Sequence, residues 1–395
     1  MKNFLKNIFQ IDHAIVAGLT VIIIELMVFI AINLEFLNPV VRAVNSFSMA
    51  DIYHKIQNSG NPSEVCSTIT IVDISELTHR KDIAQVIRTI NEMKPSVLGV
   101  DIIFEGEKSD STGDELLAET CLDNISRTVF AYKLTDYDES KFSYQNSLHS
   151  YFTTSDGVKE GFVNLVDNPE KNVRKYANTL LFHDTLTYSF PFKISQLVTQ
   201  RVTDDDAIHT INYKPVVFPI IKHHELDHYR EYITGHIVLL GATQDERDRF
   251  YTPIGQKSGV EILAYTILSL TDGHPIRHAS WWTVLLWALI AGYLTNLIDY
   301  WLTSRLQNHQ SSMILFITQS EMYHKGIYFI VMVMITWISF ELYARCGYFV
   351  DTVLALATIV LIEEGRRLYI ALLSVLKKKK LDSFVKKSIY ANIIK

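Results

Sequence analysis

The chain has 395 residues, 48% of them hydrophobic and 20% charged, a composition that accommodates several membrane spans beside one folded domain. Its net charge of -6 provides no broad basic surface, which argues against nucleic acid as a partner. Three cysteines without a CxxC pair argue against a zinc ribbon or a thioredoxin-like site.

The first apolar run, residues 14–34, follows a short N-terminus of residues 1–13. Its length matches the roughly 20 residues that cross about 30 Å of hydrocarbon. Bulky residues follow it in place of a small-residue cleavage motif, so we expect an uncleaved anchor. Its one acid, Glu25, either faces other helices, where it has a function, or is tolerated at a cost of about a few kcal/mol.

Residues 35–280 alternate strand-like and helix-like stretches, which predicts an α/β domain with a mixed, largely parallel sheet. The helix that starts at Asp82 carries a stripe of isoleucine and valine, and lies between two strands that contain Asp73 and Asp101. The strands are expected at residues 68–74, 96–104, 128–133 and 237–241, and a last helix at 260–270.

Three further apolar runs follow, at residues 281–302, 327–344 and 348–362, with a loop at 303–326 and a basic tail at 363–395. The last run is short, so its crossing is argued from charge. Basic residues near both chain ends place both ends in the cytoplasm by the positive-inside rule, which requires four spans and puts residues 35–280 outside. The alternative, three spans with the tail outside, would put the basic tail on the wrong side. The basic residues of the tail are Arg366, Arg367, Lys377, Lys378, Lys379, Lys380, Lys386, Lys387 and Lys395.

Two cysteines, Cys66 and Cys121, lie within the α/β domain. If this domain faces an oxidising compartment, the two can form a disulfide; otherwise they are separate thiols.

Candidate ligand-binding residues follow the predicted strands. Asp73 and Asp101 lie at or near strand ends, where open α/β sheets collect ligand groups, and a carboxylate pair can bind a cation or perform acid/base work. The alternative role is to cap the strand ends in hydrogen-bonded turns. A ligand site is expected near Asp73, Asp101 and Phe104, with Gly241, Thr243 and Asp248 from the later strand end. The loop from Gly241 either closes over a ligand or orders the sheet edge, and Arg174 is expected to pair with one of the aspartates.

Several sequence features argue against catalysis and metal binding. The chain lacks a nucleophile elbow, a P-loop, a GxGxxG motif and a kinase signature, so we expect no enzyme activity and no cofactor. Its closely spaced histidines match no zinc-site spacing, so we expect surface histidines and no metal. These histidines are His223, His224, His228 and His236.

An ordered set of segments resembles the type-two CHASE domain, an extracytoplasmic sensory module of bacterial signalling receptors. The segments read VDIS, VLGVDIIF, GFVNLVDNPEKNVRKY, YSFPFKISQL, GHIVLLGATQDERDRFYTPIG and SGVEILAYTILSL, and the resemblance covers about residues 38–375. The stretch ELTHRKDIAQ replaces the Trp- and Pro-rich turn common in the family, so no role of that turn carries over. A kinase or cyclase usually follows the last membrane helix in the family, but only about 33 residues follow residue 362, so we expect no output enzyme.

The resemblance implies a receptor-like protein of the bacterial inner membrane that works as a homodimer and passes an outside signal to a separately encoded partner. The alternative is an envelope scaffold or assembly protein that uses the CHASE-like domain as a docking surface. The tail has basic and apolar residues at roughly helical spacing, as expected of a helix on an anionic lipid surface or of a helix that docks on a partner.

Overall fold

The computed structural model describes residues 10–33, 49–59, 64–108, 111–153, 157–166, 172–199, 208–272, 276–307, 312–378 and 385–391. The chain divides into two compact units. We call Asp51–Arg277 the α/β unit, and Met1–Ala50 together with His278–Lys395 the helical unit.

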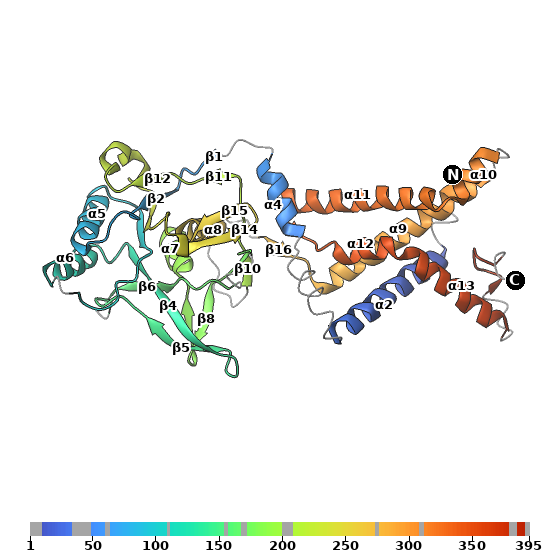
Figure 1. Ribbon diagram of the computed structural model, residues 1–395, viewed down its shortest axis with the longest axis horizontal. Coiled ribbons are helices and arrows are strands. Elements are labelled where there is room, and N and C mark those ends of the chain that lie inside the picture. The colour runs from blue at the N-terminus through green and yellow to red at the C-terminus, as the bar shows by residue number, and fades with distance from the viewer. Residues whose placement is uncertain are drawn as a thin grey trace. The chain divides into compact units, whose positions relative to one another are not determined.

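The α/β unit is built around one mixed sheet (Figure 1). Its strands lie in the order β12-β2-β13-β3-β4-β5-β8-β9, and β6 pairs with β4. The pairs from β12 to β4 and the β4–β6 pair are parallel, whereas β4–β5 and β8–β9 are antiparallel, which confirms the predicted mixed, largely parallel sheet. The strands are β1 (Glu64–Val65), β2 (Ile69–Asp73), β3 (Val97–Val100), β4 (Thr128–Asp138), β5 (Ser143–Leu148), β6 (Lys159–Phe162), β7 (Lys175–Ala177), β8 (Thr179–Phe182), β9 (Thr185–Tyr188), β10 (Ile208–Thr210), β11 (Val216–Val217), β12 (Ile220–Lys222), β13 (Ile237–Gly241), β14 (Arg249–Thr252) and β15 (Gly255–Ser258).

Helices cover both faces of the sheet, so the central strands are buried on both sides. Every residue of β2 and β13 is buried, as their continuous apolar sequences predict. One core packs α7 and α8 against the sheet, and the other packs α5 and α6 against the opposite face. The helices are α4 (Met49–Ser59), α5 (Arg80–Glu92), α6 (Ser111–Leu122), α7 (Phe190–Val198) and α8 (Gly259–Thr271), with the short 3-10 helices η2 (Leu226–Tyr232) and η3 (Glu246–Asp248).

Two details differ from or complete the sequence analysis. Strand β3 ends at Val100, earlier than predicted, because the backbone beyond it bonds to a loop: Phe104 N–H donates to Ser150 Oγ over 3.0 Å. Cys66 and Cys121 are both buried free thiols that belong to different cores, so they are separate and not bridged.

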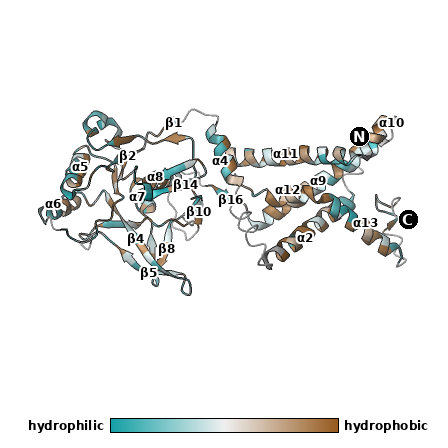
Figure 2. Cartoon of the chain, viewed as in Figure 1, coloured by the Kyte–Doolittle hydropathy of each residue, from teal (hydrophilic) through white to brown (hydrophobic). Residues whose placement is uncertain are grey.

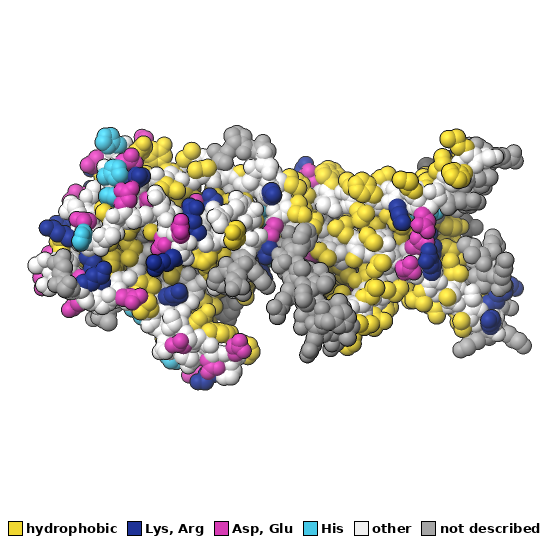
Figure 3. All heavy atoms as spheres, in the orientation of Figure 1, with side chains coloured by type: hydrophobic (Ala, Val, Ile, Leu, Met, Phe, Trp, Pro, Cys, Tyr) yellow, Lys and Arg dark blue, Asp and Glu magenta, His cyan; other side chains and the backbone are white. Residues whose placement is uncertain are grey.

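The helical unit contains three helices long and apolar enough to cross a membrane among the described residues. They are α2 (Ile11–Asn33), α9 (Trp281–Gln307) and α11 (Glu321–Cys346), and they show a long apolar helix at each of the first three predicted spans. Apolar residues dominate these helices (Figure 2) and hydrophobic side chains cover much of their surface (Figure 3). The side chain of Glu25 is exposed on α2, so it does not face the other helices of this chain.

The fourth predicted span, residues 348–362, is not one continuous helix. It comprises the two-residue strand β17 (Tyr348–Phe349), the helix α12 (Val353–Val360) and the first residue of α13 (Ile362–Lys378). The predicted loop 303–326 is also shorter, because α9 and α11 extend into it and α10 (Ser312–Gln319) lies between them. The short strand β16 (Arg277–His278) precedes α9.

A layer of buried polar side chains joins the helices of this unit. Arg366 of α13 donates to Asp299 over 2.6 Å and to Asn296 Oδ1 over 3.0 Å, both on α9. His324 of α11 also contacts Asp299, at 2.5 Å, and His13 of α2 lies 3.0 Å from the amide nitrogen of Asn296. We call these five residues the polar layer.

Residues 385–391 pack onto the same part of the bundle. Ser388 donates to Asp12 of α2 over 2.6 Å, and Tyr369 of α13 donates to the same carboxylate over 2.7 Å. Tyr390 reaches Asn296 of the polar layer. At the other ends of the helices, Ala279 N–H donates to Phe349 O over 2.8 Å, which joins the chain before α9 to the chain after α11.

Candidate functional site

A cavity of about 480 Å³ opens where β3, β4 and β6 reach their carboxyl ends, beside the start of α8. Open α/β sheets bind ligands at this edge, because loops and helix N-termini converge there. The wall combines apolar side chains with a few polar ones, which is typical of small-molecule sites. The lining residues are Asp101, Ile103, Lys133, Val163, Asn164, Leu165, Asp248, Phe250, Gly259 and Leu263.

Asp101 is the least satisfied polar group of this cavity. Its backbone N–H is bonded to Leu240 O over 2.8 Å, but no donor in the described part of the chain hydrogen-bonds its carboxylate. Burial, together with the negative charge of Asp248, raises the pKa of Asp101 to about 7. The carboxyl group therefore holds a proton in part of the molecules near neutral pH. A cation that binds beside it would favour the deprotonated form.

Asp248 occupies the N-terminus of α8, where a helix attracts negative charge. Its Oδ2 accepts the N–H of Gly259 over 3.0 Å. A Cβ at position 259 would lie 2.4 Å from that oxygen, so only glycine leaves room for this contact. Burial raises the pKa of Asp248 despite the Gly259 hydrogen bond, and the charge of Lys133 acts in the opposite direction. Two carboxyl groups with raised pKa values thus share one cavity.

Asn164 is held rigidly at the cavity wall. Its Nδ2 donates to Leu134 O and its Oδ1 accepts Leu134 N–H, each over 2.8 Å, so the side chain continues the edge of β4. Arg174, which the sequence analysis expected to pair with a strand-end aspartate, instead binds Asp51 of α4 through Nε at 2.7 Å and Nη2 at 2.5 Å. Among the described residues that line the cavity, Lys133 is therefore the one cation.

Asp73 has a different role from Asp101. Its Oδ1 accepts the N–H and the hydroxyl of Ser75, at 3.1 and 2.5 Å, and the N–H of Thr243 at 3.0 Å. Burial acts to raise the pKa of Asp73, but these hydrogen bonds outweigh it and hold the pKa below its ordinary value. Asp73 therefore ties together the chain segments that leave β2 and β13, which agrees with the capping role.

The other candidate residues divide between the two faces of the sheet. Gly241 lies at the end of β13, where a Cβ would be 3.1 Å from Val260 and 3.4 Å from the Cβ of Asp101. Phe104 is buried in the opposite core, against Phe152. The structure thus brings together Asp101, Gly241 and Asp248, places Thr243 with Asp73, and separates Phe104 from both groups.

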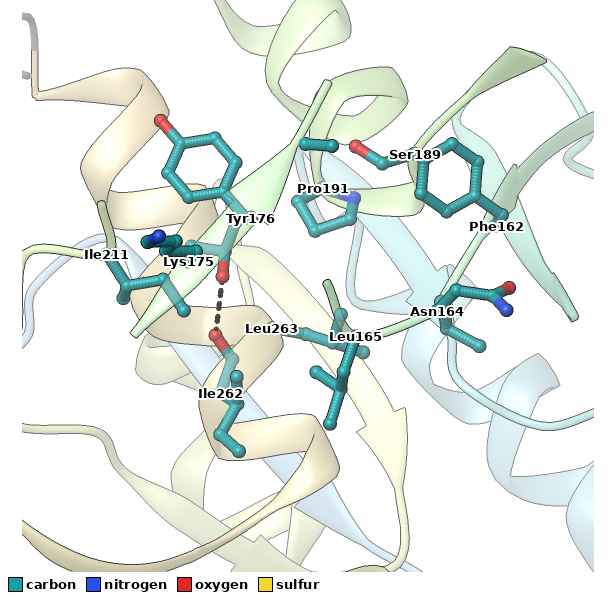
Figure 4. Close-up of a pocket in the computed structure, with 13 residues that line it drawn as sticks. Phe162, Asn164, Leu165, Lys175, Tyr176, Ser189, Pro191, Ile211, Ile262 and Leu263 are labelled. Atoms are coloured by element: carbon teal, nitrogen blue, oxygen red, sulfur yellow. Dashed lines mark hydrogen bonds between the residues drawn. The ribbon is translucent and has the colours of Figure 1, made fainter. Parts of the chain in front are cut away.

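A second, smaller pocket of about 20 Å³ adjoins the cavity (Figure 4). It shares Val163, Asn164, Leu165 and Leu263 with the cavity wall. Pro191 and Ile262 also line it, and Thr266 donates to Ile262 O over 2.9 Å. Its volume suits one water molecule rather than a ligand.

The sequence analysis did not identify Lys133, Leu165, Phe250 or Leu263 as lining residues. They come from β4, the segment after β6, β14 and α8, and only the fold brings them together. The sequence of β4 offered one signal, because Lys133 is a charged residue within an apolar run.

The order of the elements defines a class of protein. One long apolar helix precedes the α/β domain in the sequence, and further apolar helices follow it. These helices indicate a multi-pass membrane protein. The sequence profile of the CHASE2 domain matches residues 19–297, and the chain belongs to this family. Neither a curated protein nor a solved structure gives a match to this chain.

Proposed function

We propose that the chain is a sensor of the bacterial cytoplasmic membrane, with its α/β unit outside the cytoplasm. A small molecule binds the strand-end cavity, and the helical unit passes the event to a separately encoded partner. The observation that carries the proposal is Asp101, a carboxyl group without a donor at the wall of a cavity of about 480 Å³. A carboxyl group with a perturbed pKa at a cavity wall can accept hydrogen bonds from a ligand.

The cavity favours a ligand with a positively charged nitrogen on a small apolar body. Asp101 and Asp248 would accept hydrogen bonds from the nitrogen. The ligand charge would replace the proton that burial, together with the charge of Asp248, retains on Asp101. Phe250, Leu165 and Leu263 offer the apolar contacts. Under this proposal the chain binds its ligand and does not transform it.

The helical unit supports four crossings with both chain ends in the cytoplasm. The polar layer joins the start of α2, the later part of α9, the start of α11 and the start of α13. The Ala279–Phe349 contact lies at the opposite ends of α9 and α11. The two groups of contacts thus lie at opposite ends of the helices. This arrangement fits helices that cross the membrane in alternating directions, with α12 and its flanking residues as the fourth crossing.

The ligand can be tested on the full-length protein in detergent. We would measure its Tm with butylammonium and tetramethylammonium chloride against sodium chloride of equal ionic strength. We expect butylammonium, which has N–H donors, to raise the Tm of the wild type and not that of Asp101→Asn, because binding to the native state stabilises it. Tetramethylammonium has no N–H and should raise the Tm less. Asp138→Asn, in an exposed turn, should behave as the wild type. Equal shifts in all three proteins would contradict a site at Asp101.

The partner can be tested by affinity purification from the native membrane with mass spectrometry. Truncation of the basic tail would also remove the hydrogen bonds of Tyr369 and Ser388 to Asp12, so reversing the charge of lysines of the tail is the better test. Lys377, Lys378, Lys386 and Lys387 are exposed and can be changed to Glu together. The sensor proposal expects a kinase, cyclase or regulator that is lost in this variant and kept in Lys81→Glu. Recovery of envelope proteins alone from all three proteins would favour the scaffold function.

A further inference from the structure

A cluster of side chains of the types that bind metal ions lies away from the cavity, at the β12 edge of the sheet. Strand β12 runs parallel to β2, with Lys222 opposite Asp73, and His223 N–H donates to Asp73 O over 3.3 Å. The two segments that follow β2 and β12 therefore start side by side, so the residues after Asp73 lie next to the residues after Lys222. Histidine side chains gather with acidic ones near β12 on the surface (Figure 3).

Three of these residues have their ligand atoms in one place. One atom each from Glu76, His223 and His224 lies within 4.8 Å of the other two. The turn after β12, closed by Glu225 N–H to Lys222 O over 2.9 Å, presents both imidazoles on the same side. Their rings stand edge to face with centroids 5.0 Å apart. His228 and His236 are not members of this group.

We propose that Glu76, His223 and His224 form a binding site for a zinc ion. Two imidazoles and one carboxylate are borderline ligands that suit zinc, whereas magnesium and calcium prefer oxygen ligands. Ligand atoms about 2.1 Å from a tetrahedral ion lie roughly 3.4 Å apart, so only small side-chain rotations are needed. Three protein ligands leave the fourth position for water or for an external group.

The sequence analysis expected no metal, because the histidine spacing matches no known pair. The fold adds a ligand that no spacing within this histidine segment could reveal, because Glu76 follows β2 and the histidines follow β12. One competitor is present: Lys222 Nζ lies 3.3 Å from Glu76 Oε1. Both of these side chains are about half exposed, and an ion pair of this kind is weak. Zinc would displace the lysine.

The test is a zinc titration of the untagged, full-length protein in detergent after treatment with a chelator, read with a competing chromophoric indicator. We expect the wild type to bind one zinc ion at this site. His223→Ala with His224→Ala should abolish that binding, and Glu76→Gln should weaken it by more than about tenfold. His228→Ala is the matched control, an exposed histidine of the same segment, and should bind as the wild type.

Two further measurements make the result decisive. Lys222→Met should tighten zinc binding, because it frees Glu76. Cobalt should give visible absorption of a four-coordinate ion in the wild type and not in the double histidine variant. Zinc binding that survives the double substitution, that magnesium at the same concentration displaces, or that does not occur in the wild type would overturn the proposal.

Discussion

The carboxylates on the two faces of the central sheet have different surroundings. On the α5/α6 face, Asp114 pairs with Arg80 over 2.7 Å, and both side chains are only 6% exposed. On the α7/α8 face, the charge that acts on the pKa of Asp101 is that of another carboxylate, Asp248. The first pair is complete within the chain, whereas the second places two carboxylates in one cavity that has a single cation, Lys133, among its described lining residues. The comparison teaches that unpaired charge, rather than charge as such, distinguishes the candidate site.

The largest expected effect comes from breaking the complete arrangement. Arg80→Ala should destabilise the protein by about 3–5 kcal/mol, because it leaves Asp114 buried without its partner. The guanidinium also lies over the ring of Tyr151, 5.0 Å from its centroid, so packing is lost as well. The measurement is the Tm of the full-length protein in detergent. Lys81→Ala, at the exposed neighbouring position, is the control, and equal shifts for both would show that the pair does not stabilise the fold.

Asp73, at the end of β2, offers a second test of the same rule. Asp73→Ala should cost about 2–3 kcal/mol, because Ser75 and the N–H of Thr243 lose their acceptor. Since the pKa of Asp73 is lowered, its contribution is present above the ordinary aspartate pKa and is lost as the pH falls. The difference in Tm from the wild type should therefore shrink in acid. Asp138→Ala, which removes a similar Ser140 contact from an exposed turn, should change the Tm less.

Asp101 should show the opposite sign. Its pKa is raised to about 7, so the native state keeps a proton that the unfolded chain has already lost, and stability falls as the pH rises from about 4 to 7. Asp101→Asn removes this loss and should stabilise the protein by about 1–3 kcal/mol at pH 8. The gain should vanish near pH 4. A variant less stable than the wild type at pH 8 would show that Asp101 is already paired.

The sequence predicted the parts of the fold that local pattern controls. Strand β13 and helix α8 agree with their expected ranges within one residue, because a continuous apolar run and a 3.6-residue stripe each reflect burial directly. The end of β3 was not predictable, since it depends on a hydrogen bond to Ser150. The helix ends within the predicted fourth span were also not predictable. Here α12 is short, and charged residues begin in the first turn of α13.

The candidate site was predictable only in part. Strand-end position correctly identified Asp101 and Asp248 as neighbours, since parallel strands present their ends at one edge. It could not distinguish Asp73, because the N–H of Thr243, one of the groups that hydrogen-bond its carboxylate, comes from a chain segment distant in sequence. Phe104 lies three residues beyond Asp101, yet it packs in the opposite core.

The polar layer of the helical unit restricts how its helices can slide. Arg366 bonds to Asp299 and to Asn296 at once, so a small axial displacement of α13 would stretch both contacts without offering new ones. Equivalent positions on a helix recur only after a full turn, about 5.4 Å along its axis. Movement of α13 against α9 is therefore expected to occur in discrete steps with a barrier between them, as in a ratchet, and not as a continuous drift.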